Sequence, residues 1–432
     1  MQYFSTNDNA PLVSFKQATI NGQAPDKGLY FPEAIPLLPE SFIKNIDNYS
    51  NGAIAYEVIK PYVAASIPED ILKNIVEETI NFPIPLIYIN EQISSLELFH
   101  GPTLAFKDVG ARFMSRCLGH FVKDQPKKVT VLVATSGDTG GAVANGFYDV
   151  PNIEVIILYP SGKVSTVQEK QLTTLGKNIH ALEVKGSFDD CQQMVKETFS
   201  KAEDFKNLFL TSANSINVAR WLPQQFYYFF AYKQWAYKNN PPVIAVPSGN
   251  FGNICAGILA NASGLPVKHF IAACNANDVV PHYFETSLYE PKKAVATISN
   301  AMDVGNPSNF VRILEIFNQQ IDDLKKLVSA QSVSDDETKA TLKMVKEKFN
   351  YLLDPHGAVG YHALEIYLQQ HPDQKGLVVE TAHPVKFFDV VEPITGEAIT
   401  IPEIVKEQLL LEKKALLIEN NSEALREYLM KI

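Results

Sequence analysis

The amino-acid sequence predicts an α/β protein with a mostly parallel sheet, organised in two or three domains. From about residue 129, short apolar runs of strand length alternate with longer amphipathic runs, and this alternation is typical of βαβ units. Glycine-containing loops follow several of the apolar runs, as they do at the carboxyl ends of parallel strands. The length of 432 residues exceeds what one ordinary hydrophobic core can organise.

The strands and helices of this alternation can be assigned in chain order. Apolar runs predict strands at 129–135, 152–160, 178–186, 208–212, 243–247, 269–277 and 376–380. Amphipathic stretches predict helices at 136–147, 165–176, 187–200, 218–238, 251–262 and 355–370. Ser187 or Asp189 is expected near the cap of the third helix, and Pro223 is expected to start or kink the fourth.

Three stretches fall outside this alternation. The first 90 or so residues contain short segments, many prolines and one acidic helix candidate at 68–80, so we expect an N-terminal region of residues 1–92 packed on a core of residues 93–432. The segment 322–349 is charged and is expected to be a helical excursion on the surface. The tail from about residue 402 is amphipathic and is expected to be helical.

The composition excludes several classes of protein. The net charge of −10 argues against a nucleic acid or an anionic membrane as partner. The start of the chain lacks the features of a secretory signal, and the longest apolar runs are of strand length, so a cytoplasmic protein is expected. The four cysteines show no CxxC pair and are expected to be reduced and buried, and the nine histidines show no metal-binding pattern.

The loop SGNFGN, residues 248–253, is the best candidate for an anion site. It follows the expected strand at 243–247 and opens a helix. Gly249 and Gly252 allow a close approach of the backbone, and the amides at a helix start point toward a bound phosphate. A glycine-rich turn without a ligand is the alternative. The loop matches neither of the common nucleotide-binding patterns, so nucleotide binding is disfavoured.

Two further loops could bind an anion. SGDTGG, residues 136–141, offers Ser136, Asp138 and Thr139, although helix capping alone explains these residues. NSINVAR, residues 214–220, places Ser215 and Arg220 at the start of a helix, where the planar guanidinium could hold a phosphate or a carboxylate. The alternative for Arg220 is an ordinary surface arginine.

Lys107 stands between Phe106 and Asp108 in the run HGPTLAFKDVGARF. A lysine in so apolar a run must be paired, exposed or chemically committed, because an isolated ammonium is costly to bury. No zinc-hydrolase or serine-hydrolase signature accompanies it.

Five motifs together resemble one family. In chain order, the motifs are HGPTLAFKD, ATSGDTGG, NSIN-x-x-R, VPSGNFGN and ETAHP. Their order and spacing resemble threonine synthases of the long-chain bacterial and fungal type, and the resemblance covers nearly the whole chain. It implies the fold type II of pyridoxal-phosphate enzymes, shared with the tryptophan synthase β subunit. Residues 93–432 would then form two open-sheet αβα lobes with the cofactor between them, the smaller lobe covering about 110–220, and the N-terminal region would be additional.

The resemblance also implies roles for individual residues. Lys107 would be the lysine that forms a Schiff base with pyridoxal 5′-phosphate, and its apolar setting would favour the neutral, nucleophilic amine. The cofactor phosphate would be held by the loop residues Gly249, Asn250, Phe251, Gly252 and Asn253. Thr381 would lie by the pyridine nitrogen, and Asp138 near the phenolic oxygen of the cofactor. Contacts to the substrate would come from Thr135, Ser136 and Thr139 for its carboxylate and from Ser215 and Arg220 for its phosphate.

The implied activity is that of a carbon–oxygen lyase acting on phosphates. Such an enzyme converts O-phospho-L-homoserine and water into L-threonine and phosphate by γ-elimination and β-addition of water, the last step of threonine biosynthesis. We expect a monomer or a homodimer. The alternatives are a serine or threonine dehydratase or a cysteine synthase of the same fold, and a threonine-synthase-like protein that binds ligand without turnover. The first group eliminates from Cβ and does not need the Ser215/Arg220 phosphate site.

Overall fold

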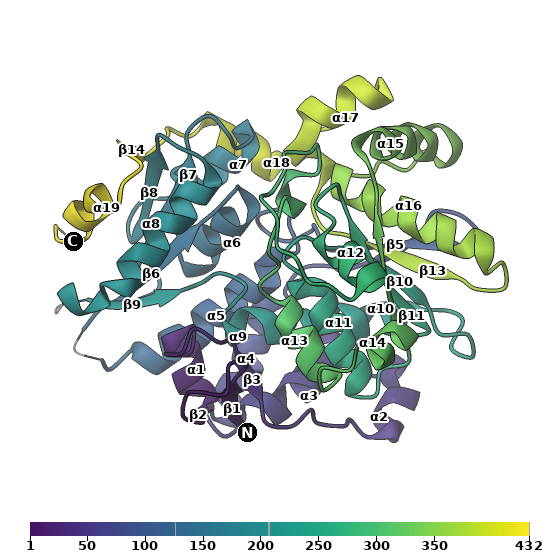
Figure 1. Cartoon of the computed structure of the whole chain (residues 1–432), viewed down its shortest axis with the longest axis horizontal. Coiled ribbons are helices and arrows are strands. Elements are labelled where there is room, and N and C mark those ends of the chain that lie inside the picture. The colour runs from purple at the N-terminus through teal and green to yellow at the C-terminus, as the bar shows by residue number, and fades with distance from the viewer. Residues whose placement is uncertain (126, 206–207, 432) are drawn as a thin grey trace. The chain divides into compact units, whose positions relative to one another are not determined.

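The computed structural model describes residues 1–125, 127–205 and 208–431 of the chain. These residues form two compact units (Figure 1). Unit 1 contains residues 31–106 and 221–400, and unit 2 contains residues 2–30, 107–220 and 401–432. The expected N-terminal region of residues 1–92 is therefore divided between the units, and the stretch expected as the smaller lobe lies within unit 2.

Unit 1 is built on a sheet with the strand order β12-β11-β10-β13-β5-β4 (Figure 1). Its strands are β4 (Leu86–Tyr88), β5 (Ile93–Glu97), β10 (Val243–Pro247), β11 (His269–Cys274), β12 (Val328–Ser332) and β13 (Gly376–Glu380). All neighbours pair in parallel except β4 and β5, which are antiparallel. The central strand β10 is therefore buried between two parallel neighbours, as its continuous apolar sequence predicts.

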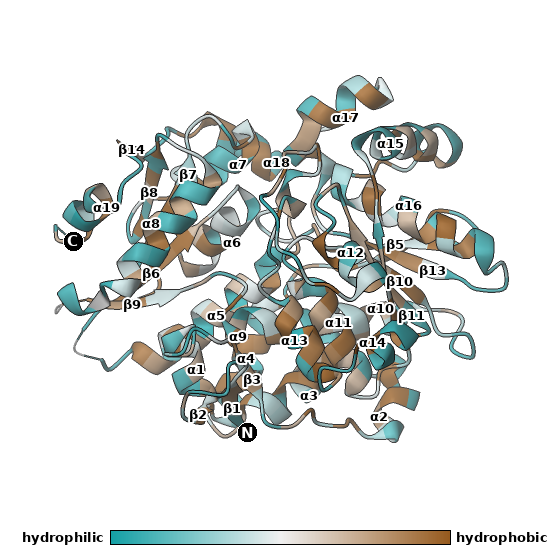
Figure 2. Ribbon diagram, in the orientation of Figure 1, coloured by the Kyte–Doolittle hydropathy of each residue, from teal (hydrophilic) through white to brown (hydrophobic). Residues whose placement is uncertain are grey.

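Helices cover this sheet and extend from it. The α-helices of unit 1 are α2 (Glu40–Lys44), α3 (Asn51–Val63), α4 (Glu69–Thr79), α10 (Gln225–Gln234), α11 (Gly252–Ala262), α12 (Val279–Thr286), α13 (Phe310–Ile316), α14 (Ile321–Leu327), α15 (Asp335–Phe349), α16 (Pro355–Gln370) and α17 (Phe388–Thr395). Short 3₁₀ helices are η1 (Ile46–Asn48), η3 (Leu222–Gln224), η4 (Asn300–Met302) and η5 (Pro384–Phe387). Leu364 of α16 packs in one core with Val243, Ile271 and Val378 of the sheet, and hydrophobic residues are concentrated in α11 (Figure 2).

Unit 2 is built on a five-stranded sheet with the order β14-β8-β7-β6-β9, in which all neighbours are parallel. Its elements are β1 (Gln2–Ser5), β2 (Val13–Ser14), α1 (Phe15–Asn21), α5 (Lys107–Val122), β6 (Val129–Ala134), α6 (Asp138–Phe147), β7 (Ile153–Pro160), α7 (Thr166–Thr173), β8 (Ile179–Val184), α8 (Phe188–Ser200), η2 (Ala202–Asp204), β9 (Phe209–Ser212), α18 (Glu403–Leu410), β14 (Ala415–Ile418) and α19 (Ser422–Leu429). Strand β3 (Tyr30–Pro32) and helix α9 (Val218–Trp221) span the junctions between units. Leu132, Ile156, Leu182, Met194 and Leu425 are part of one core in this unit.

The parallel α/β architecture predicted from the sequence is confirmed, including several details of capping. Ser187 caps α8 and forms a capping box with Asp190, so the first of the two expected cap residues is the right one. Pro223 lies in η3, between α9 and α10, and so interrupts the long aromatic helix as expected. All four cysteines are free and buried.

Two predicted helical segments were wrong in part. The segment 322–349 contains strand β12, and the tail from residue 402 contains strand β14. Each strand occupies the edge of its sheet and pairs with one neighbour only. Pairing with the sheet outweighs the local pattern at these places.

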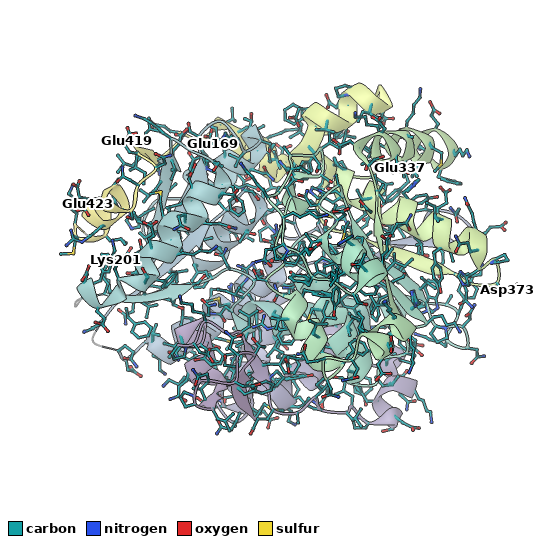
Figure 3. The ribbon with its side chains drawn as sticks, in the orientation of Figure 1. Glu169, Lys201, Glu337, Asp373, Glu419 and Glu423 are labelled. Atoms are coloured by element: carbon teal, nitrogen blue, oxygen red, sulfur yellow. The ribbon has the colours of Figure 1, made fainter. Side chains whose placement is uncertain are left out.

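Several acidic side chains lie on the surface of the protein. Glu337, Asp373 and Glu423 are exposed on the outside of their units (Figure 3). Among the described residues, no helix is long and apolar enough to cross a lipid bilayer.

Candidate functional site

The segment that leads into Lys107 is held by the loop TAHP, which follows β13. Phe106 N–H donates to the Thr381 carbonyl at 2.9 Å, and His383 N–H donates to the Leu104 carbonyl at 3.1 Å. Ala105 and Ala382 form an antiparallel bridge between these two bonds. The buried Lys386 donates from Nζ to the Thr103 carbonyl at 2.8 Å, and the Tyr227 hydroxyl donates to the Phe106 carbonyl. The backbone before Lys107 is therefore fixed on several sides.

Lys107 is the first residue of α5 and is half-buried. The N-terminal end of a helix carries a partial positive charge, which disfavours a second positive charge beside it. A neutral amine can act as a nucleophile and can accept a proton.

Arg220 packs against the helix that Lys107 opens. A Cβ atom on Gly110 would lie 2.6 Å from the carbonyl oxygen of Arg220 and 3.2 Å from its Nε, so only glycine allows this approach. Lys107 and Gly110 are three residues apart and share one face of α5. Arg220 is buried and donates from Nη1 to the Ala213 carbonyl at 2.5 Å. It is therefore not the surface arginine of the alternative interpretation. Ser215, in the same loop, is half-buried.

The loop SGDTGG leaves the same sheet edge as the loop of Arg220, because β6 and β9 are parallel neighbours. The Thr135 hydroxyl accepts from the amides of Gly137 and Gly140 at 3.0 and 2.9 Å, so it builds the turn itself. The buried Asp138 accepts from Gln168 Nε2 at 2.9 Å, and Gly137 leaves room for this glutamine. Ser136 and Thr139 are half-buried.

The loop SGNFGN and the loop TAHP also share a sheet edge, since β10 and β13 are parallel neighbours. A Cβ atom on Gly249 would lie 2.6 Å from the Cα of Met302, so the backbone packs directly on η4. Asn250 accepts from Ser308 N–H at 2.6 Å through Oδ1 and from Asn309 Nδ2 at 3.1 Å through its carbonyl. Phe251 has a φ of 61°, in the left-handed region, and caps α11.

The donors of this loop fit a phosphate. Helix α11 begins at Gly252, and the N–H groups of a first helical turn have no intrahelical acceptor. Asn253 is buried, and its Oδ1 accepts from the Tyr228 hydroxyl at 2.7 Å. Its Nδ2 has no hydrogen-bond partner in the part of the chain that the structure describes. A buried donor of this kind is costly unless an anion or another acceptor pairs with it.

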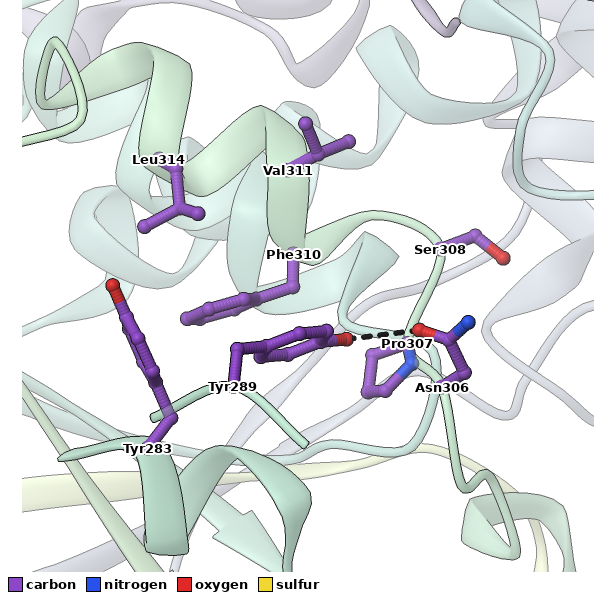
Figure 4. Close-up of a pocket in the computed structure, with 8 residues that line it drawn as sticks. All are labelled: Tyr283, Tyr289, Asn306, Pro307, Ser308, Phe310, Val311 and Leu314. Atoms are coloured by element: carbon purple, nitrogen blue, oxygen red, sulfur yellow. Dashed lines mark hydrogen bonds between the residues drawn. The ribbon is translucent and has the colours of Figure 1, made fainter. Parts of the chain in front are cut away.

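A separate cavity of about 350 Å³ lies beside the 306–314 segment (Figure 4). Its lining consists of Tyr283, Tyr289, Asn306, Pro307, Ser308, Phe310, Val311 and Leu314. None of the residues predicted from the sequence lines it. Two of its lining residues contact the candidate site: Ser308 N–H donates to Asn250 Oδ1, and the Phe310 ring packs edge-on against Phe251 with the ring centres 5.7 Å apart.

Family comparisons agree with this arrangement of loops. Residues 92–381 match the family of pyridoxal-phosphate dependent enzymes. Residues 2–80 match the threonine synthase N terminus, and residues 357–429 match the threonine synthase C-terminal family. Threonine synthase of Escherichia coli is 44% identical over 409 residues, which cover 94% of each chain. The chain belongs to the threonine synthase family. The yeast threonine synthase is 34% identical over 487 residues, covering 96% of this chain and 95% of that one.

Solved structures give the same result. The threonine synthase structure from Escherichia coli has a TM-score of 0.93 at 42% identity and covers 100% of both chains. A structure described as PLP-bound threonine synthase from Brucella melitensis has a TM-score of 0.92 at 34% identity, covering 100% of this chain and 99% of that one. Maize serine racemase, with a TM-score of 0.52 at 17% identity, shares the fold.

The comparisons confirm the predicted family, the α/β fold of type II, the activity class of a pyridoxal-phosphate-dependent lyase, and the cofactor. The roles of individual residues stay predictions. The structure brings these residues together in two groups, one in each unit. Unit 1 holds Gly249, Asn250, Phe251, Gly252, Asn253 and Thr381, and unit 2 holds Lys107, Thr135, Ser136, Asp138, Thr139, Ser215 and Arg220.

The sequence did not reveal the residues that support these loops. Gln168 contacts Asp138, Asn309 holds Asn250, and Tyr227 binds the backbone before Lys107. They lie 30, 59 and 121 residues from their partners, and none stands in a recognisable motif.

Proposed function

We propose that this member of the threonine synthase family converts O-phospho-L-homoserine and water into L-threonine and phosphate. The observation that carries this proposal is the buried Arg220 packed on Gly110 of the helix that Lys107 opens. A guanidinium has five donors, so Arg220 can hold the Ala213 carbonyl and a phosphate oxygen together. A dehydratase or a cysteine synthase does not require this second oxyanion site. We expect a cytoplasmic monomer or homodimer.

The two anions would be bound by different parts of the chain. Gly249, Asn250, Phe251, Gly252 and Asn253 would hold the cofactor phosphate through backbone amides and the Asn253 side chain. Ser215 and Arg220 would hold the substrate phosphate. Ser136 and Thr139 would donate to the substrate carboxylate, whereas Thr135 would shape the loop that presents them. Two dedicated anion sites are needed because the protein as a whole is acidic.

Lys107 would bind the cofactor and then move protons. Pyridoxal phosphate, when bound, supplies an electron-withdrawing ring that stabilises negative charge on the substrate carbons. Lys107 Nζ would accept the protons that leave Cα and Cβ of the substrate and return protons at Cγ and, after water adds at Cβ, at Cα. The proton released by the water balances the charge of the departing phosphate. Arg220 would stabilise the charge that collects on the phosphate as it leaves Cγ. Thr381 would offer a hydroxyl to the pyridine nitrogen, and Gln168 would hold Asp138 beside the ring.

Replacing Arg220 with alanine tests the substrate assignment. A charge-assisted hydrogen bond contributes about 1.5–3 kcal/mol to binding free energy. Its loss should therefore lower kcat/KM for O-phospho-L-homoserine by roughly one to two decades. Part of the loss should appear in kcat, because the phosphate changes its charge distribution as it leaves. Cofactor affinity should hardly change.

Steady-state kinetics and a cofactor titration of the folded variant check this expectation. The exposed Arg426, also in unit 2, provides a matched control as Arg426→Ala. Normal turnover by Arg220→Ala would remove this arginine from the substrate site. Loss of cofactor together with turnover would mean that the two phosphate sites had been exchanged.

Replacing Asn253 with aspartate tests the cofactor loop. The change keeps the shape of the side chain and the oxygen that accepts from Tyr228, but it converts the buried Nδ2 donor into a charged acceptor. The affinity for pyridoxal phosphate should fall by roughly ten-fold or more. Affinity for pyridoxal, which lacks the phosphate, should change much less. Equal effects on the two ligands would show that Asn253 does not face the phosphate.

A further inference from the structure

A buried aspartate–histidine pair lies at the start of α16 in unit 1. Asp354 and His356 are both buried, and His356 Nδ1 lies 2.5 Å from Asp354 Oδ2. Asp354 is also the N-cap of α16, where its Oδ1 accepts from Gly357 N–H at 2.8 Å. The His356 ring packs on Phe387 with the ring centres 4.8 Å apart. None of the proposed catalytic roles uses this pair.

The contacts of His356 fix the position of its hydrogen. The backbone N–H of Ala301 lies 3.1 Å from His356 Nε2. A backbone N–H can only donate, so Nε2 accepts and the hydrogen of the neutral ring is on Nδ1. Nδ1 then donates to Asp354. The aspartate therefore holds the histidine in the tautomer that can bind Ala301, as in other pairs in which a carboxylate orients an imidazole.

The residue bound by His356 belongs to the surface on which the SGNFGN loop rests. Ala301 is part of η4 (Asn300–Met302). A Cβ atom on Gly249 would lie 2.6 Å from the Met302 Cα and 3.2 Å from the Ala301 carbonyl oxygen. A displacement of η4 would therefore move Gly249 directly. The hydrogen bond from Ala301 N–H to His356 Nε2 links η4 to the start of α16.

Other charged groups face the pair. Asp303, after η4, accepts from Thr297 Oγ1 at 2.7 Å and from Asn275 Nδ2 at 2.9 Å. Glu380 lies against the first turn of α16, where a Cβ atom on Gly357 would fall 1.6 Å from its Oε1. Among the described residues, neither lies within hydrogen-bonding distance of the His356 ring, so Asp354 is the carboxylate that orients the imidazole. Glu380 interacts with Asp354 and not with the ring.

We propose that Asp354 and His356 are positioning residues that hold η4, and through it Gly249 and the SGNFGN loop, in the geometry that binds phosphate. The proposal rests on the proposed function, in which this loop holds the cofactor phosphate. Asp354 sets the tautomer, His356 accepts from Ala301, and η4 supports the loop. The pair acts on the cofactor through other residues, at no point touching it.

Two substitutions of His356 separate positioning from simple packing. A glutamine side chain is long enough to place an oxygen near the former Nε2, where it can accept from Ala301. An asparagine reaches only the former Nδ1, so it can contact Asp354 but leaves the Ala301 N–H without an acceptor. His356→Asn should weaken pyridoxal-phosphate binding by about ten-fold, whereas His356→Gln should stay within about three-fold of the original protein.

A third variant tests the tautomer. Asparagine and aspartate cap helices about equally well, so Asp354→Asn should retain α16. The amide nitrogen of the new asparagine can, however, face His356 Nδ1 and donate to it. The ring hydrogen then moves to Nε2, where it points at the Ala301 N–H, and the hydrogen bond with Ala301 is lost. Asp354→Asn should therefore resemble His356→Asn. In the His356→Gln background the same change should have little further effect, because no tautomer is left to control.

Three readouts are compared on the full chain: the affinity for pyridoxal phosphate, the affinity for pyridoxal, and amide hydrogen exchange of residues 249–253 and 301. His356→Asn should lower the affinity for pyridoxal phosphate about ten-fold and leave the affinity for pyridoxal nearly unchanged. It should also speed amide hydrogen exchange at Ala301 and in the loop. His269→Gln is the control. This half-buried histidine is the first residue of β11 in unit 1, and its Nε2 is hydrogen-bonded to the hydroxyl of Ser329 in β12. It should leave the affinity ratio of the two ligands unchanged.

The outcomes separate this proposal from the proposed function. Equal losses in His356→Asn and His356→Gln, or unchanged exchange at Ala301 in all variants, would overturn the positioning role. Faster loop exchange with no selective loss of pyridoxal phosphate would support positioning of the loop but overturn its role as the phosphate site. In that case Asn253→Asp should also fail to discriminate between the two ligands, and the proposed function would lose its cofactor loop.

Discussion

Replacing Lys107 with alanine should abolish covalent attachment of the cofactor and essentially all turnover. Lys107 is the first residue of α5, and the backbone before it is fixed by the TAHP loop and by Tyr227. The loss of proton transfer alone would cost roughly two to four decades in rate, and the loss of the nucleophile adds to this. No other lysine stands in the five sequence motifs.

Borohydride reduction of the cofactor-loaded protein, followed by peptide mapping, locates the attachment directly. A pyridoxyl group should be found on Lys107, and the visible absorption of the attached cofactor should be missing in Lys107→Ala. The exposed Lys123, just beyond the end of α5, provides the matched control as Lys123→Ala. Modification of any other lysine would contradict the assignment, as would turnover retained by the alanine variant.

The fold could be predicted from the sequence wherever burial was complete. Strands β6, β7 and β10 have neighbours on both sides and read as continuous apolar runs. Strands β12 (VSAQS) and β14 (ALLI) lie at sheet edges, and both stand beside charged stretches that favour helix. Their strand conformation comes from pairing with β11 and β8, which the local sequence does not encode.

The candidate site, too, could be predicted only where the local sequence carries the signal. The loops that start helices carry glycine and small polar residues, because a close backbone approach requires them, and these are visible in the sequence. The side chains that support the loops are not. Asn309, Gln168 and His356 are ordinary residues in their own segments and gain their roles only through tertiary contacts. Glu380 was part of the motif ETAHP, yet nothing in the sequence showed that its carboxyl group is buried.

The environment of Glu380 differs strongly from that of an ordinary carboxyl group. It ends β13, immediately before Thr381, and is fully buried. Burial raises the pKa of Glu380 well above its ordinary value, and the charge of Asp354 and a side-chain hydrogen bond with Asp354 act in the same direction. The nearby His383 adds no compensating charge, because burial lowers its pKa to about 4. Folding therefore favours the protonated form of this carboxyl group.

This protonation has a definite consequence for stability. A carboxyl group whose pKa is raised on folding stabilises the protein fully below its unfolded pKa, near 4.3, and that contribution is lost as the pH rises toward the folded pKa. In this window the folded state binds one more proton than the unfolded state, so the free energy of unfolding falls by about 1.4 kcal/mol per pH unit. Glutamine has the shape of the protonated acid and does not titrate. Glu380→Gln should therefore be more stable than the original protein, by a margin that grows as the pH rises from the unfolded pKa toward the folded pKa.

Urea unfolding of both proteins between pH 5 and pH 8 measures this margin. Glu154→Gln is a control of opposite sign. Burial alone would raise the pKa of Glu154, but the hydrogen bonds from Lys128 and His180 outweigh it and lower the pKa. A lowered pKa stabilises the folded state above the unfolded pKa and is lost as the pH falls through the folded pKa, so Glu154→Gln should destabilise the protein at neutral pH, with a margin that shrinks only in acid.

A margin for Glu380→Gln that does not change with pH would mean that Glu380 is ionised in the folded protein, and an unseen cation or donor would then have to lie against α16. Because Gln preserves the packing against Gly357, turnover should survive the change. A loss of turnover in a more stable variant would instead give the acidic hydrogen of Glu380 a part in the reaction.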